Sequence, residues 1–245
     1  CVDAIIKNKI KRVVIGMKDP NPLVAGKGIK KLKENNIKVK VGILEKTCKR
    51  INEVFINHIK KDTPFINLKA AMTLDGKIAS KTNDSKWISS EKSRKYVHYL
   101  RQKYSAILVG INTVINDNPR LTTRLENRKP SNPIRIILDT KCRIPLDSNV
   151  LKVNEDKKTI VITSKLADDE KIKAIEKMGV TVKKLSLKDN HIDILEVINY
   201  LSEKSIDSVL VEGGSEIYYS FLKNNLVDKL TLFISPKIIG GREAI

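Results

Sequence analysis

The tetrapeptide Glu212-Gly213-Gly214-Ser215 has the residue types of an anion-binding turn, between an apolar run at 208–211 and a helical pattern over 217–222. Glycine lets the backbone approach a ligand closely, and serine is a good N-cap. The free N–H groups and the dipole of a helix start favour phosphate. Glu212 stands at the carboxyl end of a predicted strand, where α/β sheets bind ligands. We therefore predict an anion site here, and a plain strand-to-helix turn is the alternative.

A second polar segment, NTVINDNPRLTTR at 112–124, carries Asp117, Arg120 and Arg124. The guanidinium group of arginine binds phosphate through two parallel hydrogen bonds, a geometry that lysine does not offer. Lysine dominates the basic residues of this chain, so arginine in a loop is a hint of function. Exposed loop charges without a ligand are the alternative.

The remaining residues that could take part in binding or catalysis are isolated in the sequence. Trp87 follows a polar turn at 82–86 and is either a core residue or a ring that stacks on a ring-shaped ligand. His58, His98 and His191 have no H-x-x-x-H spacing, and we interpret them as surface or packing residues. Walker and Rossmann glycine motifs are absent, so the common nucleotide-binding sequences do not apply.

Apolar periodicity predicts the elements that position these residues. Before residue 61 we expect strands at 12–17 and 37–42 and helices at 2–8, 27–35 and 44–60. After residue 64 we expect strands at 65–72, 106–109, 134–138, 159–163, 180–185, 208–211 and 230–234, and helices at 90–101, 168–178, 192–203 and 217–222. This alternation predicts α/β folding with parallel pairing. A polar linker near Lys60–Pro64 divides the chain into two domains, 1–61 and 62–245.

The composition narrows the class of protein. Hydrophobic residues make up 41% and charged residues 31%, which is typical of globular proteins. No apolar run approaches the roughly 20 residues of a membrane-spanning helix. Three cysteines without a C-x-x-C pair favour a reducing cytoplasm. The net charge of +19 leaves a nucleic-acid-binding module open, although the lysines are spread over nearly every segment.

Five motifs in order resemble one family: KAAMTLDGKIA at 69–79, S-x-W-I-S at 85–89, GINTVINDNPRLTTR at 110–124, RIILD at 135–139 and VEGG at 211–214. The family is the bifunctional deaminase/reductase of riboflavin biosynthesis, whose reductase domain has a dihydrofolate reductase-like fold. The resemblance implies a C-terminal three-layer α/β domain of that fold. It also implies that this domain follows the latter part of a cytidine deaminase-like α/β domain.

The resemblance also implies a reaction. NADPH would deliver a hydride to the ribosyl carbon of 5-amino-6-(5-phosphoribosylamino)uracil, a phosphorylated pyrimidine, and the sugar would open to a ribityl chain. Position by position, the implied NADPH contacts are Ala71, Trp87, Thr113, Asp117, Thr140, Gly214, Ser215, Glu216, Ile217, Tyr218, Tyr219 and Ser220. The implied substrate contacts are Ser85, Arg101, Leu121, Arg124 and Glu212, with Lys69 as a further candidate. These motifs offer no obvious proton donor, so we name no general acid; water or the substrate would supply the proton.

The first residues resemble the companion zinc deaminase domain, through CVDA at 1–4 and MKDPNPLVAGKGI at 17–29. Cys1 matches the second cysteine of that family's zinc motif, and the other ligands would precede residue 1. A catalytic zinc needs three protein ligands and a water. We therefore expect an incomplete deaminase domain over 1–61, with zinc and deaminase activity only in an intact protein. Family members also continue beyond Gly240-Gly241, so the last reductase strands are expected to be missing, and Asn118 stands where the family often has a second Asp.

Partners follow from the same resemblance: a homodimer or homotetramer, with no nucleic acid and no membrane. Two alternatives stay open from the residues. One is a reductase of the same fold that acts on another pterin or pyrimidine, and the other is the basic nucleic-acid-binding module.

Overall fold

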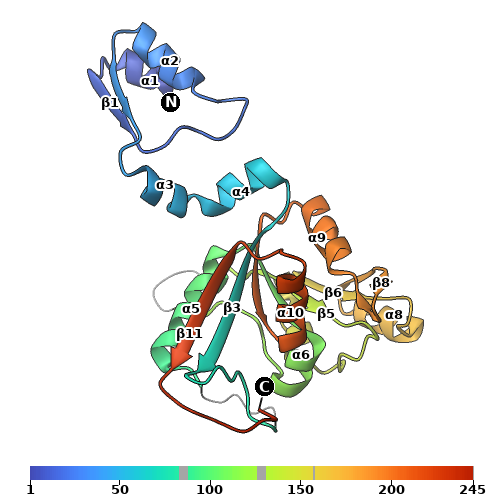
Figure 1. Cartoon of the computed structure of the whole chain (residues 1–245). Helices are drawn as coiled ribbons and strands as arrows, with labels where there is room; N and C mark the ends of the chain where they lie inside the picture. The colour runs from blue at the N-terminus through green and yellow to red at the C-terminus, as the bar shows by residue number, and fades with distance from the viewer. Residues whose placement is uncertain (83–87, 126–130, 157, 245) are drawn as a thin grey trace. The chain divides into compact units, whose positions relative to one another are not determined.

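A computed structural model describes residues 1–82, 88–125, 131–156 and 158–244. The chain folds as two compact units, Cys1–Thr63 and Pro64–Ile245 (Figure 1). The boundary between them lies inside the segment predicted as a linker. No helix in the described part of the chain is both long and apolar enough to cross a lipid bilayer.

The first unit is a small α/β arrangement. Its elements are α1 (Val2–Lys7), β1 (Arg12–Ile15), α2 (Lys27–Glu34), β2 (Lys38–Val41), α3 (Glu45–Ile51) and α4 (Glu53–Lys61). The two strands pair in parallel, with Arg12 opposite Lys38 and Ile15 opposite Val41. Leu32 of α2 and Ile37 are buried between these elements.

The single helix predicted over 44–60 is wrong, because the chain forms two helices that meet at Asn52. The Asn52 side chain donates a hydrogen bond from Nδ2 to the carbonyl oxygen of Cys48 at 2.9 Å. Asparagine competes in this way with the backbone for carbonyl groups and therefore favours helix ends over helix interiors. The apolar pattern on either side of Asn52 gave no sign of this break.

The second unit contains the sheet on which the predicted site depends. Its strands are β3 (Phe65–Thr73), β4 (Ala106–Gly110), β5 (Ile134–Leu138), β6 (Thr159–Thr163), β7 (Thr181–Lys184), β8 (Leu187–Lys188), β9 (His191–Ile192), β10 (Ser208–Gly213) and β11 (Lys229–Ser235). Its helices are α5 (Glu91–Lys103), α6 (Ile111–Asp117), α7 (Asn149–Lys152), α8 (Asp169–Lys177), α9 (Ile194–Glu203) and α10 (Ser215–Lys223), with a short 3-10 turn at Asn154–Asp156.

Seven of these strands form one sheet in the order β11-β3-β10-β4-β5-β6-β7. All six neighbouring pairs in this order are parallel, for example Val209 of β10 opposite Ala106 of β4. Parallel sheets are buried on both faces, and the five residues of β4 are accordingly all buried. The predicted α/β class with parallel pairing is confirmed.

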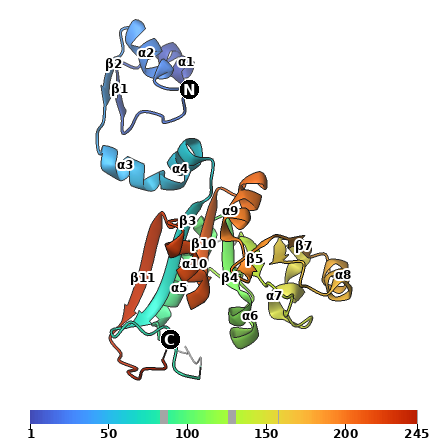
Figure 2. The ribbon, with the colours of Figure 1, turned by 45° about the vertical axis from the view of Figure 1, so that its right-hand side comes forward.

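Helices cover both faces of the sheet, which gives three layers (Figures 1 and 2). Alternate strand residues such as Leu108 and Val211 pack with α9 and α10 on one face. The residues between them, such as Ile107 and Val109, pack with α6, α7 and α8 on the other face. This alternation follows from the two-residue period of a strand.

A buried ion pair lies at the amino end of β5. Arg135 is fully buried, and its guanidinium donates to Thr159 Oγ1 at 2.9 Å and to Asp156 Oδ2 at 3.1 Å. A second guanidinium nitrogen donates to Asp156 Oδ1. These contacts tie β5 and β6 to the short turn that carries Asp156.

Candidate active site

A cleft with a volume of about 930 Å³ opens at the carboxyl ends of β3, β10, β4 and β5. Ligand pockets usually have volumes of about 300 to 1,000 Å³, so this cleft is large enough for a large cofactor. The residues that line it come from these four strands, from α5 and α6, from the start of α10 and from the segments 78–79, 88–89, 119–124, 140–143 and 190–194. The fold thus brings together motifs that are up to about 140 residues apart in the sequence.

The start of α10 forms one wall of this cleft. Gly214, and not Ser215 as expected, is the N-cap, and no side chain caps the helix. The first N–H groups of a helix have no partner within the helix, and the backbone of residues 213–215 lines the cleft. The glycines are joined by a cis peptide bond, and Gly213 has a φ of 146°. Because residues 213 and 214 are both glycines, this segment offers backbone donors to a ligand without a side chain in the way.

A glycine on the neighbouring strand lets α10 approach the sheet. A Cβ atom added to Gly110, the last residue of β4, would lie 3.0 Å from Cγ1 of Ile217 and 4.0 Å from the backbone nitrogen of Gly214. Such a contact is tighter than ordinary packing allows. Glycine at position 110 therefore sets the distance between β4 and the start of α10.

Arg101 of α5 and Glu212 of β10 form a two-pronged ion pair inside the cleft. Both donor–acceptor distances, Nε to Oε1 and Nη2 to Oε2, are 2.8 Å. The side chains are only 13% and 8% exposed. Burial raises the pKa of Glu212, but the charge and hydrogen bonds of Arg101 outweigh it and leave that pKa below its usual value. Burial likewise lowers the pKa of Arg101, and the Glu212 charge reverses that effect and raises it. Both groups are therefore charged at neutral pH.

Two more groups lie near this pair on the β3 side. The Tyr218 hydroxyl donates to the carbonyl oxygen of Lys69 at 2.7 Å. Burial, with the Glu212 charge adding to it, raises the pKa of Tyr218, so the hydroxyl stays protonated. The Lys69 ammonium lies 5.8 Å from the centre of the Phe233 ring and lowers the pKa of Glu212 through its charge.

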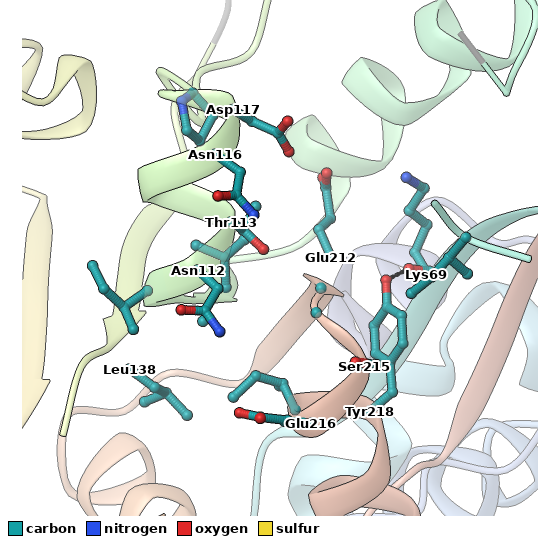
Figure 3. A pocket seen from close by; sticks show the side chains of 18 of the residues that line it. Lys69, Asn112, Thr113, Asn116, Asp117, Leu138, Glu212, Ser215, Glu216 and Tyr218 are labelled. Atoms are coloured by element: carbon teal, nitrogen blue, oxygen red, sulfur yellow. Dashed lines mark hydrogen bonds between the residues drawn. The ribbon is translucent and has the colours of Figure 1, made fainter. Parts of the chain in front are cut away.

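The opposite wall is the polar face of α6. Figure 3 shows Thr113, Asn116 and Asp117 on the side facing Glu212, Lys69 and Tyr218. The segment 112–124 was expected to be a loop, but Ile111–Asp117 forms a helix because Ile111 and Val114, three residues apart, are both buried.

Asn118 ends α6 in the left-handed region, at a φ of 40°. Its Oδ1 accepts from the backbone N–H of Asn149 at 2.8 Å, and its carbonyl accepts from the Asn149 side chain at 2.9 Å. Asparagine and aspartate tolerate this conformation better than other side chains do. The departure from the family pattern at position 118 therefore concerns a contact with the start of α7 and not a lining residue of the cleft.

The cleft contains nearly all described residues that the resemblance had assigned to it. Lining residues among them are Lys69, Ala71, Arg101, Thr113, Asp117, Leu121, Arg124, Thr140, Glu212, Gly214, Ser215, Glu216, Ile217, Tyr218 and Ser220. Tyr219 does not line it: its side chain is 63% exposed, and Lys223 lies over its ring. Ser85 and Trp87 lie outside the described residues.

Sequence reasoning missed several lining residues, among them Arg94, His98, Asn116, Lys141 and Arg143. One available signal was helical spacing. Residues 94, 97, 98 and 101 share one face of a helix, so the assignment of Arg101 to the site already implied that His98 lies beside it.

Cys1 belongs to the first unit and is not among the residues that line this cleft. It is exposed and precedes α1. Among the residues that the structure describes, no three His, Cys, Asp or Glu side chains are grouped closely enough to hold a metal ion. The described residues therefore do not provide the three protein ligands of a catalytic zinc.

The comparisons with known proteins agree with one another. The family model described as RibD C-terminal domain matches residues 64–245. The riboflavin biosynthesis protein RibD of Aquifex aeolicus is 45% identical over 98% of this chain, which spans 65% of that relative.

Two solved structures give the same picture. A diaminohydroxyphosphoribosylaminopyrimidine deaminase/5-amino-6-(5-phosphoribosylamino)uracil reductase from Thermotoga maritima is 41% identical, with a TM-score of 0.81 over 98% of this chain and 64% of its own. RibD of Acinetobacter baumannii is 31% identical, with a TM-score of 0.82 over 100% of this chain and 66% of its own. The chain thus spans slightly less than two thirds of these proteins. These likenesses confirm the predicted dihydrofolate reductase-like fold.

Proposed function

The chain belongs to the RibD C-terminal domain family, and from this premise we propose that it is an NADPH-dependent reductase of riboflavin biosynthesis. Its substrate would be 5-amino-6-(5-phosphoribosylamino)uracil, and its product the ribitylamino compound. The strongest support is one arrangement: the uncapped start of α10 and the Arg101–Glu212 pair line a single cleft. A dinucleotide phosphate and a polar, phosphorylated pyrimidine each find matching groups there.

The residues present fit NADPH. The backbone N–H groups at the start of α10 would hold its pyrophosphate. Ala71, Thr113, Asp117 and Thr140 would contact the rest of the molecule along the strand ends. When bound, NADPH supplies the hydride. The chain's part is to hold the cofactor and the ribosyl carbon in line within the same cleft.

The far end of the cleft favours NADPH over NADH. Lys141 and Arg143 line it beside Thr140, just after β5. Arg143 is oriented by a hydrogen bond of 2.7 Å from its Nη2 to Asn112 Oδ1. Two cations at this end match a 2′-phosphate, which NADH lacks.

The substrate would bind at the other end, around Glu212. Arg101 uses three of its five N–H donors on Glu212 and Thr122, and a carboxylate has about four acceptor positions. The pair can therefore remain intact while Glu212 accepts from the diaminouracil or ribose. The spare donors of Arg101, together with Arg124, would neutralise the phosphate, with Lys69 and Leu121 alongside. Glu212 remains ionised, so its charge would favour an iminium-like carbon as it forms.

We further propose that residues 1–61 correspond to part of the pyrimidine deaminase domain, whose activity belongs to the intact protein. Membership of the family does not favour the two alternatives, a nucleic-acid-binding module and a reductase for another pterin or pyrimidine. A homodimer or homotetramer and a cytoplasmic location remain predictions.

The decisive experiment follows NADPH oxidation by absorbance while a separate, intact deaminase generates the substrate. We expect turnover that depends on that deaminase. Glu212→Gln should abolish most of it, whereas Lys95→Ala, which removes an exposed ion pair with Glu91 on α5, should not. Tight NADPH binding without turnover on this substrate, but with turnover of dihydrofolate, would favour the other reductase.

A further inference from the structure

One face of α5 is turned into the cleft, and it carries a histidine that no motif had assigned. Arg94, Val97, His98 and Arg101 occur at positions i, i+3, i+4 and i+7 and all line the cleft. His98 lies one turn before Arg101, which holds Glu212. It is therefore built into the same wall as the buried ion pair.

Both ring nitrogens of His98 contact Arg124. The backbone N–H of Arg124 donates to Nδ1 at 3.3 Å. The guanidinium Nη2 lies 3.3 Å from Nε2. A guanidinium group can only donate, so a ring nitrogen must accept, which a doubly protonated imidazole cannot do. A neutral imidazole has one acceptor nitrogen and one N–H, so only one of the two contacts is a hydrogen bond at any time, and that bond favours an uncharged ring.

The surroundings of His98 act in the same direction. Burial lowers its pKa first, and the charges of Arg101 and Arg124 lower it further. Glu212 and a hydrogen bond with the Thr122 carbonyl oppose this shift without reversing it. The ring is accordingly neutral at physiological pH and able to accept from Arg124.

Arg124 depends on this contact for its place. It is exposed, and none of the described carboxylates lies within ion-pair distance of its guanidinium. The two residues before it have further anchors: the Thr122 carbonyl accepts from Arg101 at 3.2 Å, and the Thr123 N–H donates to Asn132 Oδ1 at 3.1 Å. A free arginine side chain of this length occupies many rotamers, and fixing one costs entropy.

We propose that His98 is a positioning residue that holds Arg124 at the substrate-phosphate end of the cleft. The inference rests on the proposed function, because it takes Arg124 as a ligand of the substrate phosphate. His98 acts through Arg124 and carries no proton in the reaction. Its effect is on binding, since an arginine already held in place loses less entropy when the phosphate arrives.

The test is a double-mutant cycle on substrate KM and kcat with His98→Ala, Arg124→Ala and the double variant. We expect His98→Ala to raise KM about tenfold, the effect of a lost hydrogen bond to a charged group, with kcat nearly unchanged. In the Arg124→Ala background the same change should have little further effect. Lys95→Ala, on the exposed face of α5, should leave both constants as they are.

Two conservative variants separate the contacts. The Asn oxygen can take the place of Nδ1, and the longer Gln side chain can place its oxygen near Nε2. Rescue by His98→Gln would assign the effect to the guanidinium, and rescue by His98→Asn to the backbone N–H of Arg124; either supports the proposal. Additive effects of His98→Ala and Arg124→Ala, or a fall in kcat without a rise in KM, would overturn it. Absence of turnover in the unsubstituted protein would instead overturn the proposed function, and this inference with it.

Discussion

The sheet of the second unit carries an arginine–carboxylate pair at each end, and the two pairs differ in what surrounds them. At the amino end of β5, Arg135 is fully buried, while its partner Asp156 has a 26% exposed side chain. At the carboxyl ends, Arg101 and Glu212 are both nearly buried but line a cleft of about 930 Å³. In the first pair, Arg135 also donates to Thr159, and Asp156 also accepts from Asn132. The second is surrounded by further charged or titratable groups, Lys69 and His98.

The contacts of the two ion pairs indicate different roles. Three of the contacts of Arg135 go to neighbouring elements of its own fold, and the cleft does not reach it. The pair stabilises the connection of β5 and β6. Arg101 and Glu212 keep donors and acceptors directed at an open volume, and extra charges are gathered beside them at a cost in desolvation. Under the proposed function, a polar ligand would complete this arrangement.

The largest effect should come from breaking the pair at the amino end. Arg135→Ala removes a fully buried guanidinium and leaves Asp156 without its partner. We expect the free energy of unfolding to fall by about 3 kcal/mol. This is the lower end of the range for a broken buried pair, because Asp156 is partly exposed. Urea denaturation followed by circular dichroism measures this. Lys184→Ala, which breaks an exposed pair with Asp169, is the control and should change stability little. A loss of substrate affinity in folded Arg135→Ala would contradict a purely structural role of this pair.

At the other end, Glu212→Gln should damage the chemistry and lower stability less than Arg135→Ala does, because the amide oxygen can still accept hydrogen bonds from Arg101. The amide keeps the size of the side chain but leaves the Arg101 charge without its partner and removes an acceptor for the substrate. We expect kcat/KM to fall about 100-fold, in line with truncating one member of a buried, hydrogen-bonded charge pair. Steady-state kinetics with a parallel denaturation curve measures both quantities. Equal activity with lowered stability would make this pair structural as well.

Arg124→Ala tests the substrate end in isolation. The guanidinium is exposed, so the fold should be unaffected, while the loss of charged hydrogen bonds to phosphate should raise the substrate KM about 10- to 100-fold. NADPH affinity, measured by fluorescence titration, should change little. Parallel losses for substrate and cofactor would argue against a division of the cleft into two ends.

Arg143→Ala tests the cofactor end. If its guanidinium meets the 2′-phosphate, the preference for NADPH over NADH should fall about tenfold, because only NADPH loses a charged hydrogen bond. The ratio of kcat/KM for the two cofactors gives the answer directly. Lys165→Ala, an exposed cation after β6, is a matched control. An unchanged ratio would indicate that Lys141 or another residue contacts the 2′-phosphate.

Much of the fold was predictable because its apolar runs are short and well separated. β4, β5 and β6 are buried segments of five residues each, and their observed bounds agree with the predicted ones to within one residue. Propensity failed where the contacts of one or two residues decide the structure. Asn52 breaks a helix through its own side chain, and α6 forms in a sequence of weak helix formers because Ile111 and Val114 reach the core.

The site was predictable only in part, for a different reason. Motif resemblance names residues that contact ligands, but it is silent about residues that act through others. His98 was interpreted as a packing or surface histidine, and its contacts with Arg124 depend on the position of a loop 26 residues away. Tyr219 shows the reverse: it was included with its neighbours, although in a helix the residue next to Tyr218 points elsewhere.

Asp75 extends the comparison to a carboxylate that is paired but exposed. The Asp75 side chain accepts from the Thr73 hydroxyl at 2.6 Å and from the N–H of Gly240 at 2.8 Å. The Thr73 hydroxyl, followed by the Gly240 N–H, lowers the pKa of Asp75 from 3.8 to about 2. These contacts tie the chain after β11 to the turn after β3.

The smallest predicted effect follows from this pKa. Because the folded pKa lies below the unfolded one, the ionised carboxylate stabilises the fold above about pH 4, and this contribution is lost as the pH falls toward 2. Asp75→Asn should therefore be slightly less stable than the unsubstituted protein near neutral pH, with the difference shrinking between about pH 4 and pH 2. Urea midpoints across this range measure it. A difference that stays constant with pH would mean that the geometry of the turn, rather than the charge, holds the segment.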